Sequence, residues 1–379
     1  MAMPATAAET AARRIALVVP SGAPLRQMRE LLDGVIAGGH AVLALTHGLA
    51  RADIVLLDNL GVEHRQITDQ TGAFKLLDDW RTIAAVKSAL TAWAPDTVVA
   101  YGGQSMVHGA LAAKGAGAER IILVIDALPE HRFADQLGPG EMPVWRYGQA
   151  LRACHHAIFY SHADVALLRK LAVVPPSLPV SVLPGFGVAL EGKGESPLPP
   201  LADGIVFLMV AALEQRHGVR EYCAAAARVR KRAPNTRIVL AGMGQTTGPG
   251  AVDAAELAAC ADVEFHEDVS ARPELLEACH VFVYPSVADG MPQPVLDAMA
   301  AGRPLIVADV PGCRAAVDER VNGCLFEPRN AEALAEAMES YLKRPDLIPS
   351  MARASRAKAE RYASATTVLR NLQHILGVE

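Results

Sequence analysis

The sequence is short of the features that mark membrane-spanning and disulfide-framed proteins. No apolar run approaches the roughly 18 residues that a membrane-spanning helix needs. Six cysteines are scattered along the chain without a Cys-x-x-Cys pair: Cys154, Cys223, Cys260, Cys279, Cys313 and Cys324. We therefore expect the cysteines to be reduced and to pack as small buried apolar side chains. We expect neither a disulfide framework nor a zinc site. The opening residues, MAMPATAAETAARR, lack the pattern of a signal peptide, so we expect a cytoplasmic location.

A surplus of positive charge is also missing. Residues 1–190 hold 16 basic and 16 acidic side chains, and residues 191–379 hold 20 and 25, which gives the net charge of −5. Because a nucleic-acid surface needs a basic patch, we expect no nucleic-acid partner. A strongly membrane-attached enzyme would carry basic residues in excess on its acceptor half. Peripheral membrane contact is therefore expected only as a local patch, at the inner face of the membrane.

What the sequence does contain is apolar material in an alternating pattern. Hydrophobic residues make up 51% and charged residues 20% of 379 residues, enough for the cores of two domains. Short apolar runs that alternate with helical patterns predict strands at 15–19, 40–45, 97–101, 120–126, 157–161, 205–213, 237–244, 281–284 and 305–310. A further run at 54–61 predicts another short strand. This alternation predicts an α/β fold with two doubly wound, Rossmann-like parallel sheets.

Composition places the domain boundaries. Residues 191–204, EGKGESPLPPLADG, are rich in proline and glycine and predict a linker between domains 1–190 and 205–355. Asn330 is positioned to cap an amphipathic helix that follows it. The C-terminal stretch RASRAKAERYASATTVLRNLQHIL predicts one long helix, which makes up most of the terminal segment 356–379.

The most informative stretch is VFVYPSVADGMPQPVLDAMAAGRPLIVADVPGCRAAVDERVNGCLF, residues 281–326. It predicts a buried strand, a turn, and a helix with Pro292 at its first position, and then a second strand. A strand–loop–helix of this kind directs free backbone N–H groups and the positive end of a helix at one point. The stretch therefore suits a phosphate or another anionic ligand.

The order of residues in this stretch resembles the donor-binding segment of retaining family 4 glycosyltransferases, which reads PS-x-x-EG-x-P-x-x-x-x-EA-x-A-x-G-x-P. The matching residues are Pro285, Ser286, Gly290, Pro292, Ala298, Ala300, Gly302 and Pro304. VPGCR followed by NG resembles the branch that acts in polysaccharide and lipid-linked glycan assembly. The resemblance implies GT-B architecture, in which two Rossmann-like domains face a cleft. It also implies that the terminal helix crosses back onto the N-terminal, acceptor-side domain.

The resemblance further implies transfer with retention and without a metal ion or other cofactor. Asp289 stands where the family has its first Glu and would bind hydroxyls of the donor sugar as a catalytic residue. Asp297 stands for the second Glu and would hold the ribose hydroxyls. Aspartate keeps the charge but shortens the reach by about 1.5 Å. The alternatives are that Asp289 caps the helix and that Asp297 is an exposed helix acid.

A second donor segment departs from the family pattern. Relatives read MVARL-x-x-x-KG, whose Arg and Lys neutralise the donor diphosphate, whereas this chain has Ala212 and His217 at those places. Fixed cations aimed at a leaving diphosphate are usually a large part of catalysis. His217 can supply a partial charge, and Arg216 is a neighbouring cation one position off the expected face.

The remaining donor-site candidates come from loops that follow predicted strands. Gly290, Met291 and Pro292 would present N–H groups or shape around the sugar and phosphates. Gly242 and Gly244 would let a nucleotide approach the backbone, or they form a plain strand–helix turn. Residues 263–266, ending at His266, match the segment that holds the edge of the base in relatives.

In the N-terminal half, the ends of the predicted strands supply the candidates for the acceptor side of the cleft: Ser21, Gly22, Gly102, Gly103, Asp126 and Ser161. For Ser21 and Gly22 an ordinary strand–helix turn is the alternative. His131 lies near the place where many relatives carry a catalytic histidine that hydrogen-bonds the donor sugar. A solvated loop histidine is the alternative there, and the twelve histidines of the chain favour it.

Two hypotheses on function follow. The first is an active hexosyltransferase that takes a nucleotide sugar, UDP-linked in preference to GDP-linked, to a glycan or lipid-linked acceptor in exopolysaccharide or related biosynthesis. The second is a catalytically degenerate protein of the same fold that serves as a partner or regulatory subunit, or as part of an oligomer. The four departures at positions 212, 217, 289 and 297 favour the second hypothesis. The retained acids and intact glycine framework favour the first, which we prefer.

Overall fold

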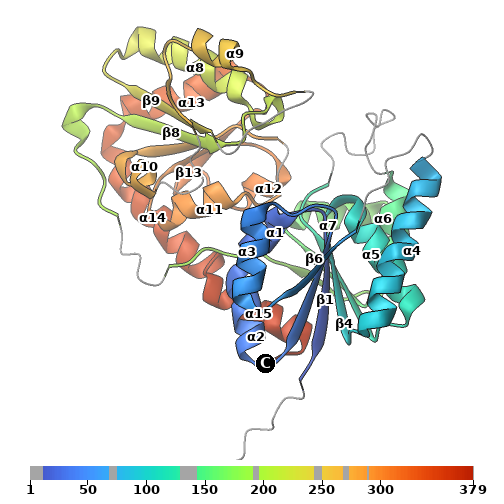
Figure 1. Cartoon of the computed structure of the whole chain (residues 1–379). Helices are drawn as coiled ribbons and strands as arrows, with labels where there is room; N and C mark the ends of the chain where they lie inside the picture. The colour runs from blue at the N-terminus through green and yellow to red at the C-terminus, as the bar shows by residue number, and fades with distance from the viewer. Residues whose placement is uncertain are drawn as a thin grey trace, which may run out of the picture. The chain divides into compact units, whose positions relative to one another are not determined.

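The computed structural model describes residues 12–67, 75–128, 143–190, 196–242, 250–267, 273–287 and 290–378. The chain divides into two compact units (Figure 1). The first unit comprises Met1–Phe186 together with Thr367–Glu379, and the second comprises Gly187–Thr366. Each unit is built around its own sheet.

The first unit contains a seven-stranded parallel sheet in the order β3-β2-β1-β4-β5-β6-β7. Its strands are β1 (Arg14–Val19), β2 (Ala41–Thr46), β3 (Glu63–Gln66), β4 (Thr97–Tyr101), β5 (Arg120–Ile125), β6 (His156–Phe159) and β7 (Val180–Val182). The order turns around between β1 and β4, which is the topology of a doubly wound fold. Strand β4, TVVAY, is buried along its whole length because helices cover both faces of a parallel sheet.

Helices of the first unit flank this sheet. They are α1 (Gly22–Gln27), α2 (Arg29–Ala37), α3 (Arg51–Leu60), α4 (Lys75–Trp93), α5 (Gly103–Ala116), α6 (Val144–Leu151), α7 (His162–Lys170) and α15 (Ala365–Leu376). Helix α5 packs against both α4 and α6, so these three form one layer (Figure 1). Gly109 allows α5 to approach β4 closely, since a Cβ there would lie 2.7 Å from the Cβ of Ala100.

The second unit contains a six-stranded parallel sheet in the order β10-β9-β8-β11-β12-β13. Its strands are β8 (Val206–Ala211), β9 (Arg237–Gly242), β10 (Glu264–His266), β11 (Val281–Tyr284), β12 (Leu305–Ala308) and β13 (Gly323–Phe326). The order turns around between β8 and β11. Both sheets therefore confirm the predicted pair of doubly wound α/β domains.

The helices of the second unit connect and cover these strands. They are η1 (Leu201–Asp203), η2 (Gln215–His217), α8 (Val219–Arg232), α9 (Ala254–Ala259), α10 (Pro273–Ala278), α11 (Gln293–Ala300), α12 (Pro311–Arg314), α13 (Ala331–Lys343), η3 (Pro345–Leu347) and α14 (Ile348–Tyr362). Asn330 caps α13 as predicted, because its Oδ1 accepts a hydrogen bond from the N–H of Ala333 at 3.0 Å.

Part of the predicted linker is fixed to the second unit by a fully buried arginine. The guanidinium of Arg303 donates to the carbonyl oxygens of Ser196 and Pro197, and also to those of Leu276 and Glu277 in α10. These four partners are uncharged backbone carbonyls, and burial of the guanidinium lowers the pKa of Arg303. The linker residues from 196 onward are therefore part of the second unit's packing.

Two predicted elements are wrong. Residues 54–61 were expected as a strand but belong to α3, which Asp53 starts by accepting from the N–H of Ala50 at 2.9 Å and Gly61 ends with φ +73°. The run IVLL misleads because only Leu57 of it is fully buried. The C-terminal stretch is two helices, not one: α14 ends at Tyr362, and Ser364 pairs with Val188 before α15 begins.

Candidate functional site

The candidate site lies where the order of the second sheet reverses, at the carboxyl ends of β8 and β11. In doubly wound sheets ligands bind at this point because the connections leave in opposite directions and open a crevice. The loop after β8 runs through η2 to Gly218, and the loop after β11 runs to Pro292. These loops hold most of the residues that the sequence predicts for the donor.

Side chain and backbone join the two loops directly. The Nδ1 of His217 lies 3.0 Å from the Oγ of Ser286, and both residues are buried. The N–H of Val287 donates to the carbonyl oxygen of Arg216 at 3.1 Å. Gly218 has φ +76°, and a Cβ there would come within 2.7 Å of Pro285. The loops can be this close only because position 218 is glycine.

Two helices begin at this junction without a side-chain cap. Helix α8 follows Gly218 and α11 follows Pro292, and neither cap residue bonds to the first turn through its side chain. Elsewhere in the unit, Asp253 caps α9 and Asn330 caps α13. The first-turn N–H groups of a helix have no partner within the helix, and the positive end of its dipole favours an anion. The junction therefore has the electrostatics of a phosphate site.

The predicted cations of the donor site are differently placed. His217 is buried at the junction through its bond to Ser286. Arg216 is exposed and forms an ion pair with Glu214 from the same loop. Ala212, which stands where relatives carry an arginine, is half-buried just after β8. The positive charge of Arg216 is thus already neutralised by the carboxylate of Glu214.

Asp297 lies on the second turn of α11, half-buried. Its Oδ1 accepts a hydrogen bond from the Nε2 of Gln293 at 3.2 Å, and the same amide donates to the carbonyl oxygen of Gly187 at 3.2 Å. The exposed helix acid that the sequence left open as an alternative is therefore not what the structure has. Gln293 holds the carboxylate in place from one turn earlier.

The residues before α11 are shaped by packing. Met291 is 7% exposed, Pro292 is buried, and Gly290 is half-buried in a bend. The sequence predicts Pro292 as the first helical residue, and this is wrong by one position: α11 starts at Gln293, and Pro292 is its N-cap. Proline appears instead inside the first turn, at Pro294, where a missing N–H costs nothing.

Two further donor candidates lie on the other side of β8. Gly242 ends β9, and a Cβ there would lie 3.1 Å from the side chain of Leu213, so β9 ends in close contact with the loop after β8. His266 ends β10, where its Nε2 lies 2.9 Å from Glu264. Hydrogen bonds from Arg237 first and from His266 lower the pKa of the Glu264 carboxyl, although burial opposes this. Strand β10 is two strands from β8, about 10 Å away.

Three predicted site residues, Asp289, His131 and Gly244, lie outside the described residues. Their roles stay predictions.

In the first unit the structure gathers the candidates at the carboxyl ends of β4 and β5. Gly102 and Gly103 have φ +60° and +49° and start α5 without a side-chain cap. A Cβ on Gly102 would lie 3.3 Å from the carboxylate of Asp126, which follows β5. Ser161 caps α7 through its Oγ, which accepts from the N–H of Asp164 at 3.4 Å.

The loop after β1 is explained by local packing. The Oγ of Ser21 accepts from the N–H of Ala23 at 3.4 Å and caps α1. Gly22 leaves room for the carboxylate of Asp53, which forms an ion pair with Arg26. The alternative of an ordinary strand–helix turn accounts for both residues.

Sequence reasoning missed a partly buried charged cluster in the same unit. Asp79 of α4 forms an ion pair with Arg146 of α6, and its Oδ1 lies 2.9 Å from the Nε2 of His108 in α5. Burial opposes ionisation of Asp79, but hydrogen bonds from Arg146 and His108 outweigh it and lower the pKa of the carboxyl. Burial also lowers the pKa of His108, against the pull of Asp79. The ring of His47 lies edge-on at 6.4 Å from His108.

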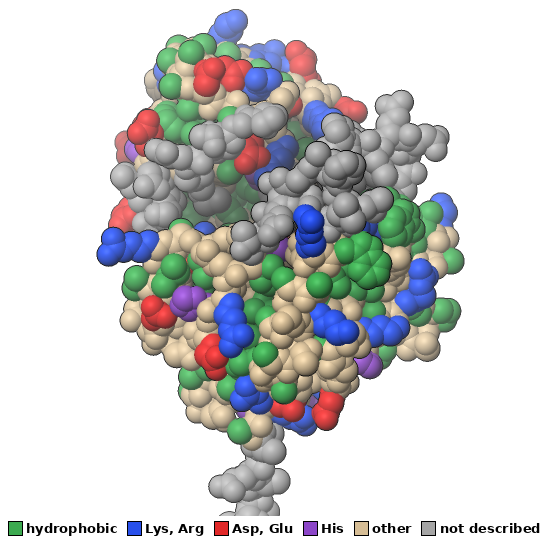
Figure 2. Space-filling view, turned by 45° about the vertical axis from the view of Figure 1, so that its right-hand side comes forward, with side chains coloured by type: hydrophobic (Ala, Val, Ile, Leu, Met, Phe, Trp, Pro, Cys, Tyr) green, Lys and Arg blue, Asp and Glu red, His purple; other side chains and the backbone are tan. Residues whose placement is uncertain are grey.

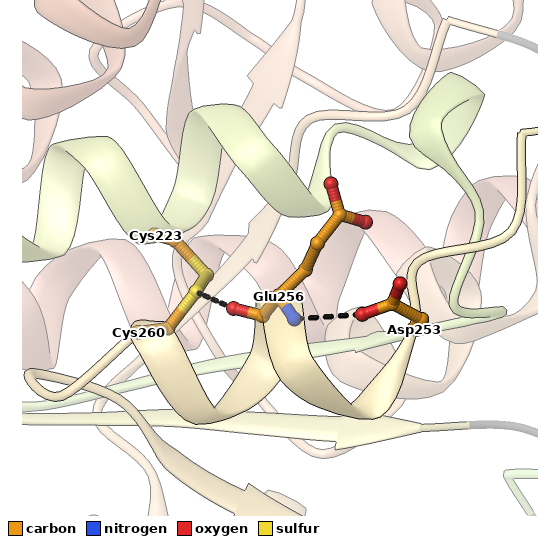
Figure 3. The surroundings of a disulfide bond; sticks show 4 residues. All are labelled: Cys223, Asp253, Glu256 and Cys260. Carbon is orange, nitrogen blue, oxygen red and sulfur yellow. Dashed lines mark hydrogen bonds between the residues drawn. A yellow bond between two sulfur atoms is a disulfide. The ribbon is translucent and has the colours of Figure 1, made fainter.

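A disulfide contradicts the expectation that all cysteines are reduced. Cys223 of α8 and Cys260 at the end of α9 are bonded, with their Cα atoms 5.5 Å apart (Figure 3). The same two helices share an ion pair between Arg220 and Glu256 at 2.5 Å. The sequence carried no signal for this pairing, because six cysteines without a motif allow 15 complete pairings and many partial ones. The disulfide ties α9 to the helix that starts at the junction.

Metal ligation and membrane spanning find no support among the described residues. No group of three or more His, Cys, Asp or Glu side chains in that part of the chain is arranged to hold a metal ion. None of the helices that the structure describes combines the length and the apolar character needed to cross a bilayer.

Part of the second unit is similar in sequence to known proteins. Residues 204–344 match the family described as glycosyl transferases group 1. The putative glycosyltransferase EpsD of Bacillus subtilis is 30% identical over 166 residues, 44% of either chain. An N,N'-diacetylbacillosaminyl-diphospho-undecaprenol alpha-1,3-N-acetylgalactosaminyltransferase of Campylobacter jejuni is 25% identical over 233 residues, 57% of this chain and 58% of that one. The chain thus spans about half the length of these curated relatives.

Solved structures match along nearly the whole chain. HepE of Anabaena in complex with UDP aligns with a TM-score of 0.75 and 18% identity over 97% of this chain and all of that one. Sucrose-phosphate synthase of Thermosynechococcus elongatus aligns with a TM-score of 0.75 and 17% identity, over 96% and 98% of the two chains. At this identity the likeness confirms the GT-B fold alone.

Proposed function

We propose that the chain is a glycosyltransferase that moves a hexosyl group from a nucleotide sugar to a glycan or lipid-linked acceptor in glycan biosynthesis. A UDP-sugar is the favoured donor and a GDP-sugar the alternative. The observation that carries the proposal is the junction of β8 and β11 inside residues 204–344, where two loops meet and two uncapped helices begin. The HepE structure was solved with UDP, which favours that nucleotide.

In this proposal the junction binds the donor diphosphate. The bond from the anomeric carbon to the phosphate breaks as the oxygen of an acceptor hydroxyl bonds to that carbon. The negative charge of the broken bond collects on the leaving diphosphate, which takes up the proton of that hydroxyl. The N-terminal ends of α8 and α11 oppose that charge with fixed dipoles, the kind of stabilisation that contributes most to such reactions. Asp297, held by Gln293, binds the ribose hydroxyls, and Asp289 binds those of the sugar. Transfer with retention and without a metal ion rests on the family resemblance.

One observation favours a second candidate, a degenerate partner subunit. Ala212 supplies no charge, and Arg216 is paired with Glu214. A site that depends on helix dipoles and His217 has less cationic charge to stabilise a leaving group. A degenerate protein can still bind the nucleotide although it no longer transfers the sugar. The two candidates are therefore distinguished by sugar transfer and not by nucleotide binding.

Thermal unfolding of the full chain with UDP, GDP and their sugars at millimolar concentration tests the proposal. A nucleotide present at about a hundred times its Kd adds roughly 2.7 kcal/mol to the free energy of unfolding. We expect stabilisation by one nucleotide family. Asp297→Asn should reduce it, because a neutral amide accepts ribose hydroxyls more weakly. Asp346→Asn, an exposed acid on η3, is the matched control and should leave it unchanged. No stabilisation by any nucleotide would contradict both candidates that bind a donor.

A further inference from the structure

Two of the three tryptophans are exposed. The exposed fraction is 73% for Trp80 and 55% for Trp145, against 4% for Trp93. Tryptophan is highly buried on average because its ring has the largest apolar area of any side chain. Exposed aromatic rings close together therefore mark a surface that another molecule covers.

The fold brings the two exposed rings into one neighbourhood. Trp80 is on α4 and Trp145 is in the first turn of α6, and the chain neighbours Asp79 and Arg146 form an ion pair between these helices. The guanidinium of Arg146 also lies 5.6 Å from the centroid of the Trp145 ring. Helices α4 and α6 each run into a strand of the parallel sheet, so their N-terminal ends lie at the carboxyl edge of that sheet. Both tryptophans are thus at the edge where doubly wound folds bind ligands.

Charge on this helix layer is one-sided. In residues 79–93, 103–116 and 144–152 the basic residues are Arg81, Lys87, Lys114, Arg146 and Arg152, and the acidic residue is Asp79. Arg146 already neutralises Asp79. Figure 2, which brings this side of the first unit forward, shows hydrophobic side chains with Lys and Arg among them. Residues 1–190 carry no net charge, but the helix layer α4–α5–α6 within them is basic.

A cavity opens between α4 and the strands β2 and β3, next to Arg81. It has a volume of about 290 Å³ and is lined by Arg65 and Arg81 together with Thr82 and the apolar side chains of Leu45 and Ile67. Arginine beside apolar walls suits a group that carries both a phosphate and hydrocarbon.

We propose that Trp80, Trp145 and the basic residues of the α4–α5–α6 layer form a docking surface for an anionic lipid bilayer. Tryptophan is enriched at the membrane–water interface, and clustered Lys and Arg attract anionic headgroups. A protein partner needs about 800 Å² of each surface. The other large hydrophobics that are exposed among the described residues lie on other elements, so two rings alone do not supply such an area. The proposal goes beyond the transferase function and does not rest on it.

Flotation of the full chain with vesicles tests the proposal. We expect binding to vesicles that contain phosphatidylglycerol and little binding to phosphatidylcholine alone, with a loss at high salt. Trp80→Ala and Trp145→Ala should each weaken binding on the order of tenfold. Arg81→Ala should weaken it about fivefold. Val55→Ala, which removes an exposed apolar side chain from α3 in the same unit, is the matched control and should bind as the wild type does.

Tryptophan fluorescence gives an independent readout because the chain has three tryptophans. Brominated lipids should quench the wild type strongly, whereas Trp80→Phe/Trp145→Phe retains only buried Trp93 and should resist quenching. The phenylalanine variant keeps an aromatic ring at both positions, so it serves as the test if the alanine variants do not fold. Absence of flotation with phosphatidylglycerol, or full flotation of the double alanine variant, would overturn the proposal. Two other results, each without vesicle binding, would also overturn it. One is concentration-dependent self-association that depends on these tryptophans, and the other is quenching of their fluorescence by a soluble oligosaccharide.

Discussion

At the scale of single residues, Gly218 controls how closely the two loops of the candidate site approach. Its φ of +76° lies in the left-handed region, and a Cβ would meet Pro285 at 2.7 Å. The hydrogen bond between His217 and Ser286 spans the same gap. A side chain at this position would therefore both strain the backbone and push the loops apart.

We predict that Gly218→Ala lowers the free energy of unfolding by about 2–3 kcal/mol and weakens nucleotide binding. Gly61→Ala is the matched control, because Gly61 has φ +73° with nothing within 4 Å of a Cβ. That variant should cost only the backbone strain, about 1–2 kcal/mol. Denaturant unfolding of both variants measures the difference, and equal losses would show that contact with Pro285 is unimportant.

His108 gives a prediction for pH dependence. Burial lowers the pKa of His108 in the folded chain below the ordinary 6.5. Between the lowered pKa and pH 6.5, the unfolded chain therefore binds a proton at this residue that the folded chain does not. Its contribution to stability is therefore fully present above pH 6.5 and decreases as the pH falls through that window. We expect His108→Gln, whose amide can still donate to Asp79, to flatten this part of the stability curve. An unchanged pH slope in denaturant titrations of the variant would contradict the assignment.

At the scale of elements, the disulfide fastens α9 to α8 beside the candidate site. Backbone bonds from Gln215 to Gly250 and from Val252 to Leu213 hold the preceding segment against the loop after β8. Cys223, Cys260 and the Arg220–Glu256 ion pair complete the attachment. The position of α9 is therefore set by contacts with the elements that form the junction.

Reduction of this disulfide should lower the free energy of unfolding by roughly 4 kcal/mol, because the bond closes a loop between residues 37 apart. Dithiothreitol should destabilise the wild type but not Cys223→Ser/Cys260→Ser. Cys324→Ser, which changes a free and half-buried cysteine, should keep the sensitivity of the wild type. The same stability with and without reductant would contradict a disulfide in the folded protein.

Local patterns predicted the elements that local chemistry determines. VFVY at 281–284 is a buried strand, and Asn330 starts its helix, because run length and capping act within a few residues. The run at 54–61 misled, since an apolar tetrad fits a strand or a helix equally well and Asp53 and Gly61 decided the outcome. The pairings of Cys223 with Cys260 and of Asp79 with His108 join distant segments, which a single sequence does not reveal.

At the scale of the whole molecule, the chain repeats one topology with different chemistry. Both sheets reverse their order between two central strands, and both reversal points carry glycines with positive φ: Gly102 and Gly103 in the first unit and Gly218 in the second. The second unit adds the uncapped helix pair and the match to glycosyl transferases group 1. The first unit adds the partly buried Asp79 cluster and the exposed tryptophans.

The central claim, that the junction of β8 and β11 binds a nucleoside diphosphate, is tested most directly by calorimetric titration of the full chain with uridine, UMP and UDP, and with the guanosine series. Charge-assisted hydrogen bonds and helix dipoles together contribute more than 1.4 kcal/mol to an additional phosphate, or a factor of ten in Kd. We predict that the diphosphate of one series binds at least tenfold more tightly than its monophosphate. Equal affinities within both series, or no binding by either, would contradict the claim.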